Sequence, residues 1–244
     1  MTIKLHRFPL SHYSEKVRAI LVFKALDYVL VEHRLGLPQL GIVRLSGQRK
    51  LPVIEHEGSV VFDSTQIALY LERTFPERRR LLPADEAARR EVLSLEERID
   101  RAFAIAPVLA GFDALRDDLD TVGRALAVEV YGVGPRLGRL LARLNARAAR
   151  LGLGRGAVER AQARTRALLG ELDDRLARSR YLVGDAPTLA DFAAVGLTLH
   201  LEYPRSRHLG VPELAGLGAP GWADDPRFAR FFAWRRRFYE ELLD

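Results

Sequence analysis

Three hydroxyl side chains surround the predicted start of a helix close to the first residue of the chain, in the segment SHYSEKVRAIL (11–21). Ser11 precedes the helix, and Tyr13 and Ser14 lie in its first turn. The N-terminus of a helix carries unpaired N–H groups and a positive partial charge, so it favours a bound anion. A hydroxyl at this position either caps the helix or donates a hydrogen bond to an anionic reacting group.

A second candidate site is the pair Leu51-Pro52, at the predicted start of a strand. Proline has no N–H to donate to a sheet, so the backbone groups of Leu51 are available to an extended peptide. The bond between them is either trans, which is the commoner form, or cis, which turns this backbone toward an open cleft.

A third candidate is Asp63-Ser64, directly before another predicted helix. A serine hydroxyl and backbone N–H groups at a helix N-terminus can bind a carboxylate, and Asp63 can pair with an ammonium group. The alternative is that the two residues only cap the helix.

The elements that position these residues follow from periodicity and turn signals. They predict a strand, a helix, a second strand, a loop, two strands joined at Glu57-Gly58, and a helix. The expected segments are 3–8, 11–26, 28–35, 51–62 and 63–75. This βαβ-ββα order is that of a thioredoxin-like domain over residues 1–83.

From residue 86 to 244 the pattern is helical throughout, which predicts an all-α helical bundle and a two-domain α+β protein. The expected helices are 86–118, 119–150, 157–178, 188–203 and 226–242. Thr188 and Asp191 fit a capping box, which we interpret as a structural cap.

The composition of the chain excludes several classes of chemistry. The 244 residues contain no cysteine, so they predict no disulfide and no thiolate metal site, and the six histidines lack metal-ligand spacing. No apolar run is long enough to span a membrane and no secretory signal is visible, so we expect a cytoplasmic protein. An arginine stripe over 136–150 favours a solvated helix face over binding to nucleic acid or membrane.

Taken in order, these segments resemble the glutathione transferase superfamily. SHYSEKVRAIL is similar to the helix start of zeta-class and omega-class members, and RKLPVIEHEGSVVFDSTQIALYLE resembles the stretch around the family's cis-proline and acidic-Ser pair. YLVGDAPTLADFAAVGLTL (181–199) is similar to the capping box and buried Asp of the family's second domain.

The resemblance implies a role for the first helix in stabilising the thiolate of glutathione. Ser11 lies where zeta-class enzymes hold the serine that stabilises this thiolate and omega-class members a cysteine. Tyr13 and Ser14 are rival hydroxyls, and His12 departs from the Pro or Ser of many relatives.

The resemblance also assigns the residues that hold the tripeptide. The Leu51 backbone would pair with the cysteinyl part of glutathione, with Pro52 cis. Asp63 and Ser64 would hold the γ-glutamyl ammonium and carboxylate, and Lys50 would reach the glycyl carboxylate.

The implied function is attack by glutathione thiolate on a small hydrophobic electrophile, in conjugation, isomerisation or dehalogenation, as in detoxification. Glutathione is then a co-substrate, the helical domain supplies the second-substrate pocket, and a homodimer is expected. Because cysteine is absent, thiol exchange through a protein cysteine is excluded. The alternative is a non-catalytic binding or scaffold protein that keeps this fold.

Overall fold

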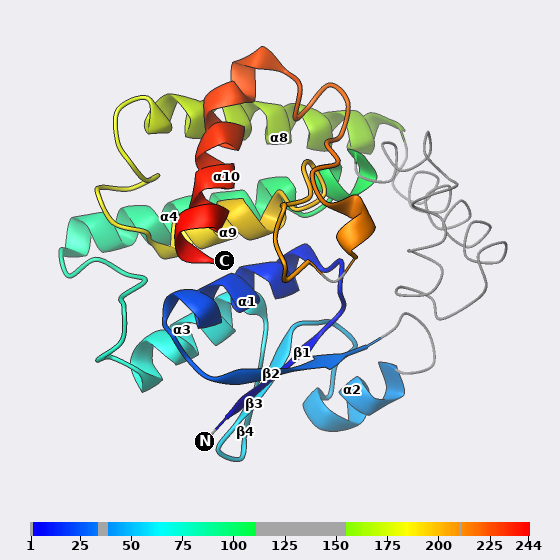
Figure 1. Ribbon diagram of the computed structural model, residues 1–244, viewed down its shortest axis with the longest axis vertical. Helices are drawn as coiled ribbons and strands as arrows, with labels where there is room; N and C mark the ends of the chain where they lie inside the picture. The colour runs from blue at the N-terminus through cyan, green and yellow to red at the C-terminus, as the bar shows by residue number, and fades with distance from the viewer. Residues whose placement is uncertain (1, 34–38, 111–154, 210) are drawn as a thin grey trace, which may run out of the picture.

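A computed structural model describes residues 2–33, 39–110, 155–209 and 211–244 (Figure 1). The N-terminal elements are β1 (Ile3–Arg7), α1 (His12–Phe23), β2 (Tyr28–Glu32), α2 (Gln39–Ser46), β3 (Val53–His56), β4 (Ser59–Phe62) and α3 (Ser64–Thr74). The described helices that follow are α4 (Glu86–Phe103), α8 (Arg155–Leu176), α9 (Leu189–Leu197), η2 (Pro212–Leu214), η3 (Pro226–Phe228) and α10 (Ala229–Leu242).

The four strands form one mixed sheet in the order β2-β1-β3-β4. β1 runs parallel to β2 and antiparallel to β3, and β4 is the antiparallel partner of β3 through a turn in which Glu57 and Gly58 both have positive φ. The predicted thioredoxin-like domain followed by helices is therefore confirmed.

One expectation for the first domain was wrong: the segment between the second and third strands contains α2 rather than only a loop. The helix is eight residues long and includes Gly41, and of its side chains Ile42 is buried. A helix of eight residues spans little more than two turns and gives a weak periodic signal, which is why the sequence pattern did not predict it.

The helix predicted over 86–118 was also wrong in its length, because α4 ends at Phe103. Helical structure resumes at 106, and Pro107 lies in its first turn. Proline has no N–H to donate to the carbonyl four residues earlier, here that of Phe103, so a continuous helix is interrupted at this point.

Two other predicted helices differ at their ends. The helix expected over 188–203 ends at Leu197, where the Thr198 hydroxyl donates to the carbonyl of Ala194 at 2.6 Å. The helix expected over 226–242 begins with the 3₁₀ turn η3 before α10. The helix predicted over 119–150, with its arginine stripe, lies outside the described residues.

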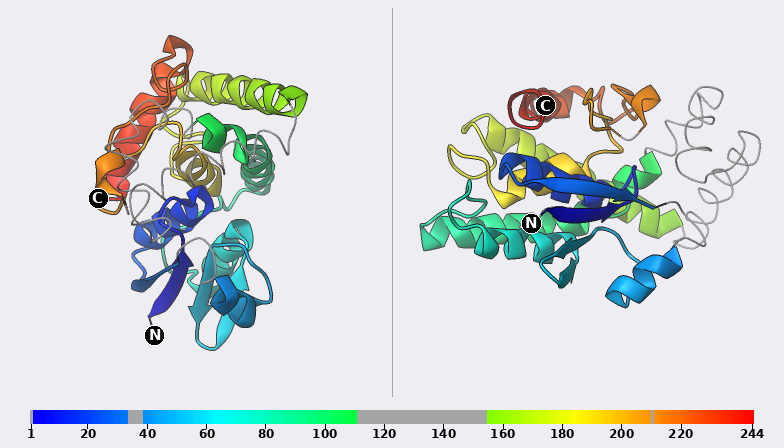
Figure 2. Two further views of the ribbon diagram at one scale, coloured as in Figure 1. Left: turned by 90° about the vertical axis from the view of Figure 1, so that its right-hand side faces the viewer. Right: turned by 60° about the horizontal axis from the view of Figure 1, so that its bottom comes forward.

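Helix α9 forms the centre of the molecule, since all nine of its residues are buried. It contacts α1 on one side and α4 on the other, so that α1 lies between the sheet and the helical domain (Figures 1 and 2). A Cβ on Gly196 would lie 2.6 Å from the backbone nitrogen of Lys16, so only glycine permits this close packing of α9 on α1.

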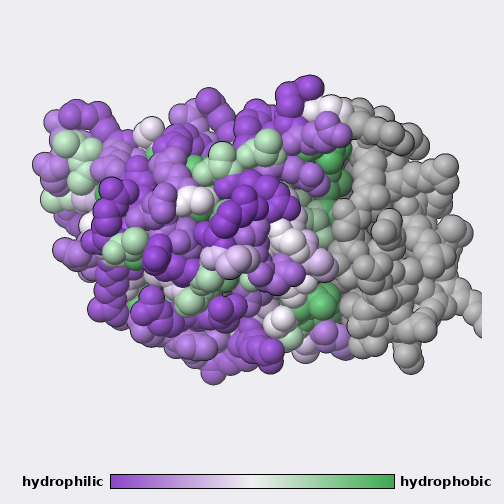
Figure 3. Space-filling view, turned by 90° about the horizontal axis from the view of Figure 1, so that it is seen from above, coloured by the Kyte–Doolittle hydropathy of each residue, from purple (hydrophilic) through white to green (hydrophobic). Residues whose placement is uncertain are grey.

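The surface on the side uppermost in Figure 1 is mostly hydrophilic, with small separate apolar patches (Figure 3). Within the described ranges, no helix has the length and apolar character needed to cross a membrane. The apolar residues of the described part are instead gathered in a large core that extends from the sheet through α9 to α10.

The first turn of α9 is held by a fully buried carboxylate. Asp191 accepts hydrogen bonds from the Thr188 backbone N–H at 2.8 Å, the Thr188 hydroxyl at 2.7 Å and the Leu182 N–H at 2.8 Å. Burial raises the pKa of Asp191 to about 6, although these hydrogen bonds favour its charged form. Asp191 therefore connects the start of α9 to the preceding loop.

We predict that Asp191→Asn lowers the free energy of unfolding by about 2–4 kcal/mol. The amide N–H₂ group of asparagine would replace one carboxylate oxygen and would face buried N–H and O–H donors that need an acceptor. Urea denaturation near neutral pH measures the change. The control is Asp185→Asn in the same loop, where the side chain is exposed and a change below about 0.5 kcal/mol is expected. Equal stability of the two variants would contradict this role of Asp191.

Candidate active site

Ser11 is the N-cap of α1, at the end of the turn that follows β1. Its backbone N–H donates to the carbonyl of Phe8 at 2.9 Å, and its Oγ accepts from the N–H of Ser14 at 3.2 Å. The side chain is partly exposed. Because the oxygen already accepts from the backbone, the hydroxyl proton remains available to donate to a group outside the helix.

The two rival hydroxyls lie in different environments. Ser14 is 1% exposed, and its Oγ is enclosed without a partner among the described residues. Tyr13 is half-buried, and burial raises its pKa to about 12, with the carboxylates of Asp100, Asp63 and Glu96 adding to the shift. Tyr13 therefore keeps its proton at neutral pH and remains a possible donor.

His12 packs inward beside these hydroxyls. Its ring lies 4.4 Å from that of Tyr13 and 5.5 Å from that of His200, measured between centroids. Burial, and after it the neighbouring His200, lowers the pKa of His12 to about 3, and burial lowers that of His200 to about 4. Both rings are therefore neutral near pH 7 and bring no positive charge to the start of α1.

The Leu51–Pro52 peptide bond is cis, which decides between the two alternatives that the sequence left open. It directly precedes β3, and the β1–β3 register pairs His6 with Val53. The dipeptide thus lies beside the end of β1 from which the chain turns into α1. Within the described part of the chain, the Leu51 N–H and C=O have no hydrogen-bond partner.

Asp63 caps α3 from a strained backbone position, with φ 69°. Its Oδ1 accepts from the N–H groups of Thr65 and Gln66, both at 3.0 Å, while the side chain is exposed. Ser64 follows and is 3% exposed. Positive φ is costly for a residue with a side chain and is common at functional sites, and it occurs here at the predicted ligand-binding pair.

Lys50 lies on an exposed stretch just before the cis-proline, and its backbone is held on both sides by one side chain. Gln48 accepts from the Lys50 N–H at 2.5 Å and donates to the Lys50 carbonyl at 2.6 Å. The Lys50 side chain has no ion-pair partner in the ranges that the structure covers. It is therefore available to an anionic group.

A buried ionic cluster, which sequence analysis missed, brings α1 and α3 together. Lys16 in α1 has no solvent exposure, and its ammonium donates to Thr65 at 3.1 Å, to Asp100 at 3.2 Å and to Glu96. The Thr65 hydroxyl also donates to Glu96. Since Thr65 belongs to the first turn of α3 and the acids to α4, this cluster fixes both candidate helix N-termini relative to each other.

A signal for this cluster exists in the sequence. Lys16 stands at helical spacing from Ala19, Ile20 and Phe23, where an apolar residue is expected. A lysine in such a stripe predicts a buried partner.

Two family models match the chain. Residues 5–79 match the glutathione S-transferase N-terminal domain and residues 155–237 match the glutathione S-transferase C-terminal domain. The chain belongs to the glutathione transferase superfamily. The domain boundaries expected at 83 and 86 stay a prediction.

Solved structures share the fold of this transferase family member. A β-etherase from Sphingobium sp. strain SYK-6 is 22% identical over 98% of this chain and 95% of its own, with a TM-score of 0.67. A glutathione S-transferase from Methylobacillus flagellatus KT with glutathione bound is 20% identical over 97% and 98%, with a TM-score of 0.62. One from Methylobacterium radiotolerans in complex with glutathione sulfonate is 24% identical over 94% and 93%, with a TM-score of 0.58.

The described residues contain no group of three or more His, Asp or Glu side chains that could hold a metal ion. The candidate site therefore consists, in this part of the chain, of hydroxyls, carboxylates, backbone groups and one exposed lysine.

We predict that His12 makes stability depend on pH. Its pKa is lowered in the folded state, so its contribution is fully present above about pH 6.5 and is lost as the pH falls toward 3. Replacement by glutamine should therefore make the free energy of unfolding fall less steeply between about pH 6 and 4, by about 1.4 kcal/mol per pH unit. Urea denaturation at a series of pH values measures the slope.

Above about pH 7 the slopes of wild type and His12→Gln should agree, because the imidazole is neutral in both states. If the free energy of unfolding has the same pH dependence in wild type and variant over the whole range, folding does not lower the pKa of His12.

Proposed function

We propose that this protein is an enzyme that binds glutathione and uses its thiolate to attack a small hydrophobic electrophile. The observation that carries the proposal is the geometry of Ser11: a partly exposed hydroxyl at the N-terminus of α1 whose oxygen already accepts a backbone hydrogen bond. Its proton is left to a ligand, and the helix end favours a negative charge there. The similar structures named with glutathione or glutathione sulfonate support a tripeptide ligand.

The tripeptide would lie across three separate segments. The unpaired N–H and C=O of Leu51 suit the backbone of its cysteinyl residue. The second carboxylate oxygen of Asp63, which has no partner in the described ranges, suits its ammonium group. The side chain of Ser64 is only 3% exposed, so its backbone N–H at the start of α3 is the group that suits the γ-glutamyl carboxylate. Lys50 suits the carboxylate at its glycyl end.

The chemical contribution of α1 would be to stabilise the sulfur anion. A free thiol has a pKa near 8.5, so only a few per cent is ionised at neutral pH. The Ser11 hydroxyl and the helix N-terminus together would lower this pKa by about two units, or about 3 kcal/mol, and make the thiolate the major form. Ser11 acts as a hydrogen-bond donor and is not itself the nucleophile.

The thiolate sulfur then forms a bond to the electrophilic carbon. In conjugation or dehalogenation the leaving group departs with the electron pair of the bond that breaks; in isomerisation the sulfur leaves again after the rearrangement. Of the three hydroxyls, Ser14 is closed to solvent, so Ser11 is the first candidate and Tyr13 the second.

We predict that Ser11→Ala lowers kcat by roughly 10- to 1000-fold, equivalent to about 1.4–4 kcal/mol, with a smaller effect on glutathione binding. Steady-state kinetics with an aromatic halide as the electrophile measures it. The matched control is Ser14→Ala three residues later, where a change below about threefold is expected because the hydroxyl is enclosed. An unchanged kcat in Ser11→Ala would contradict the role of Ser11 in stabilising the thiolate, and Tyr13→Phe would be measured next.

A separate prediction concerns the binding of the tripeptide. Asp63→Asn keeps an oxygen that can cap α3 but removes the charge, so the dissociation constant of glutathione should rise about tenfold with little loss of stability. Asp63→Ala should weaken binding similarly and also destabilise the protein by about 1 kcal/mol. Calorimetric titration and urea denaturation measure the two effects.

The absence of any binding to wild type at about 10 mM glutathione would contradict the proposal and favour the non-catalytic scaffold. Glutathione binding without turnover of any electrophile would support the proposed binding site and contradict the proposed catalytic activity.

A further inference from the structure

Strand β2 forms one edge of the sheet. The sheet order places β1 on one side of β2, and Figure 2 shows no other described strand beyond it. Two neighbouring apolar side chains of this strand, Val29 and Leu30, are 47% and 38% exposed. Neither residue belongs to the candidate glutathione site, and the proposed activity gives this edge no role.

The backbone of β2 alternates between β1 and the free edge. The Asp27 carbonyl accepts from β1 at 3.1 Å, and the His33 N–H donates to β1 at 2.8 Å. Backbone groups of residues two apart in a strand point to the same side, so the odd-numbered residues face β1. Tyr28, Leu30 and Glu32 therefore direct their N–H and C=O groups outward, and in the described ranges these groups have no hydrogen-bond partner.

The strand lacks the features that usually protect a free edge. Natural edge strands are interrupted by proline, carry lysine, contain a bulge or are covered by another element. The segment YVLVE contains no proline and no lysine, and its register with β1 is regular from end to end. An edge of this kind favours pairing with a further strand.

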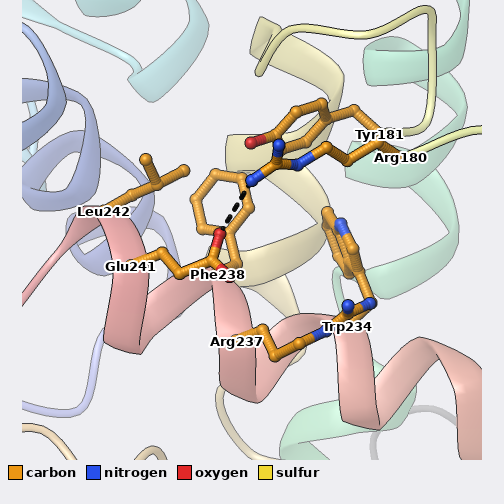
Figure 4. A pocket seen from close by; sticks show the side chains of 7 residues that line it. All are labelled: Arg180, Tyr181, Trp234, Arg237, Phe238, Glu241 and Leu242. Carbon is orange, nitrogen blue, oxygen red and sulfur yellow. Dashed lines mark hydrogen bonds and ion pairs between the residues drawn. The ribbon is translucent and has the colours of Figure 1, made fainter.

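Apolar side chains beside α10, in contrast, are covered. Arg180 lies over the ring of Tyr181, 5.6 Å from its centroid, and pairs with Glu241 at 3.1 Å (Figure 4). Tyr181 and Phe238 are only 7% and 3% exposed. The exposure of β2 is therefore not a general property of the described surface.

The backbone of β2 is complementary to an antiparallel copy of itself. With a two-fold axis at Leu30, this residue would face the partner's Leu30, and Tyr28 would face the partner's Glu32. All three outward residues then exchange hydrogen bonds with the other copy. An axis one residue earlier or later would leave Glu32 or Tyr28 opposite a residue beyond the strand.

The side chains agree with the same register. Val29 would lie opposite the partner's Val31 in a close, non-hydrogen-bonded pair, where β-branched side chains contact well. Asp27 would lie opposite the partner's His33, so that like charges do not face each other. The symmetry of the sequence about Leu30 is what favours a second copy over an unrelated peptide.

We propose that two copies of this protein join through β2, antiparallel and with the two-fold axis at Leu30, so that the two four-stranded sheets become one. The proposal assigns a location to the homodimer expected from the sequence. It does not depend on glutathione binding, so it stands or fails separately from the proposed function.

A matched pair of lysine variants tests the interface. Val29→Lys places a charge on β2, and Val60→Lys places the same charge on β4 at the opposite edge, where the side chain is 37% exposed. The register aligns these two positions on one face of the sheet. Sedimentation velocity from about 1 to 500 μM measures the molar mass of each protein.

Wild type and Val60→Lys should double in molar mass within this range. Val29→Lys should need at least about tenfold higher concentration, because the axis makes each substitution act twice. Wild type that keeps the mass of one chain throughout would overturn the proposal. The same holds if Val29→Lys associates like wild type, or if both variants are weakened equally.

Cross-linking tests the register, and the chain has no cysteine of its own to interfere. Val29→Cys and Val31→Cys are oxidised separately and as a mixture. Opposite residues of a non-hydrogen-bonded pair have Cα atoms about 4.5 Å apart, within the range of a disulfide, whereas identical positions would be about 8 Å apart. A disulfide-linked dimer should therefore form mainly in the mixture. Equal yields in the three samples, or none in the mixture, would overturn the proposed pairing.

Discussion

The arrangement of the candidate site depends on one buried cation. Lys16 has no contact with solvent, and its ammonium is held by Thr65, Asp100 and Glu96. A buried ammonium that loses its partners costs about 3–5 kcal/mol, so the helices that supply the partners must stay in register with α1. Burial raises the pKa of Asp100, whereas the neighbouring Lys16 favours the charged form of this acid.

Packing enforces the same position independently. The backbone of α9 approaches α1 so closely at Gly196 that a side chain there would collide with Lys16. At the C-terminal end of the protein, the Tyr239 hydroxyl in α10 donates to Glu15 at 3.0 Å, and Glu15 is also paired with Arg18. Helix α1 is therefore held by the sheet, α9, α4 and α10, and its N-terminus has a fixed direction.

This rigidity is what the proposed chemistry needs. A helix N-terminus and a hydroxyl stabilise an anion most when they are already oriented toward it and need no rearrangement. The Lys16 cluster also places the capped start of α3 near α1, and the field of Asp63 is strong enough at Tyr13 to contribute to its raised pKa. The two ends of the proposed tripeptide site are thus positioned by one cluster, which joins α1, α3 and α4.

Local patterns were sufficient to predict much of this fold. The alternation of apolar and polar residues predicted the strands, Glu57-Gly58 predicted the β3–β4 turn, and Asp63 predicted the start of α3. Features that depend on distant partners were harder to predict. The Lys16 cluster, for example, joins residues about eighty positions apart in the sequence.

The two wrong element predictions have local causes. Helix α2 is too short to give a clear periodic signal. The break after Phe103 follows from Pro107, which an analysis of hydrophobic spacing alone does not take into account. Candidate site residues could be proposed from the sequence because polar groups at helix starts have a recognisable chemistry, and their roles stay a prediction. Their common location could not be derived from spacing, since it depends on strand register and on the buried cluster.

The central claim is that the start of α1 turns bound glutathione into a thiolate. The most direct test is a pH titration of the ultraviolet absorbance of the thiolate in the complex of wild-type protein with glutathione. The account predicts an apparent pKa of about 6.5, two units below that of a free thiol. A value that stays near 8.5 in a saturated complex would contradict it, because binding would then occur without activation of the sulfur.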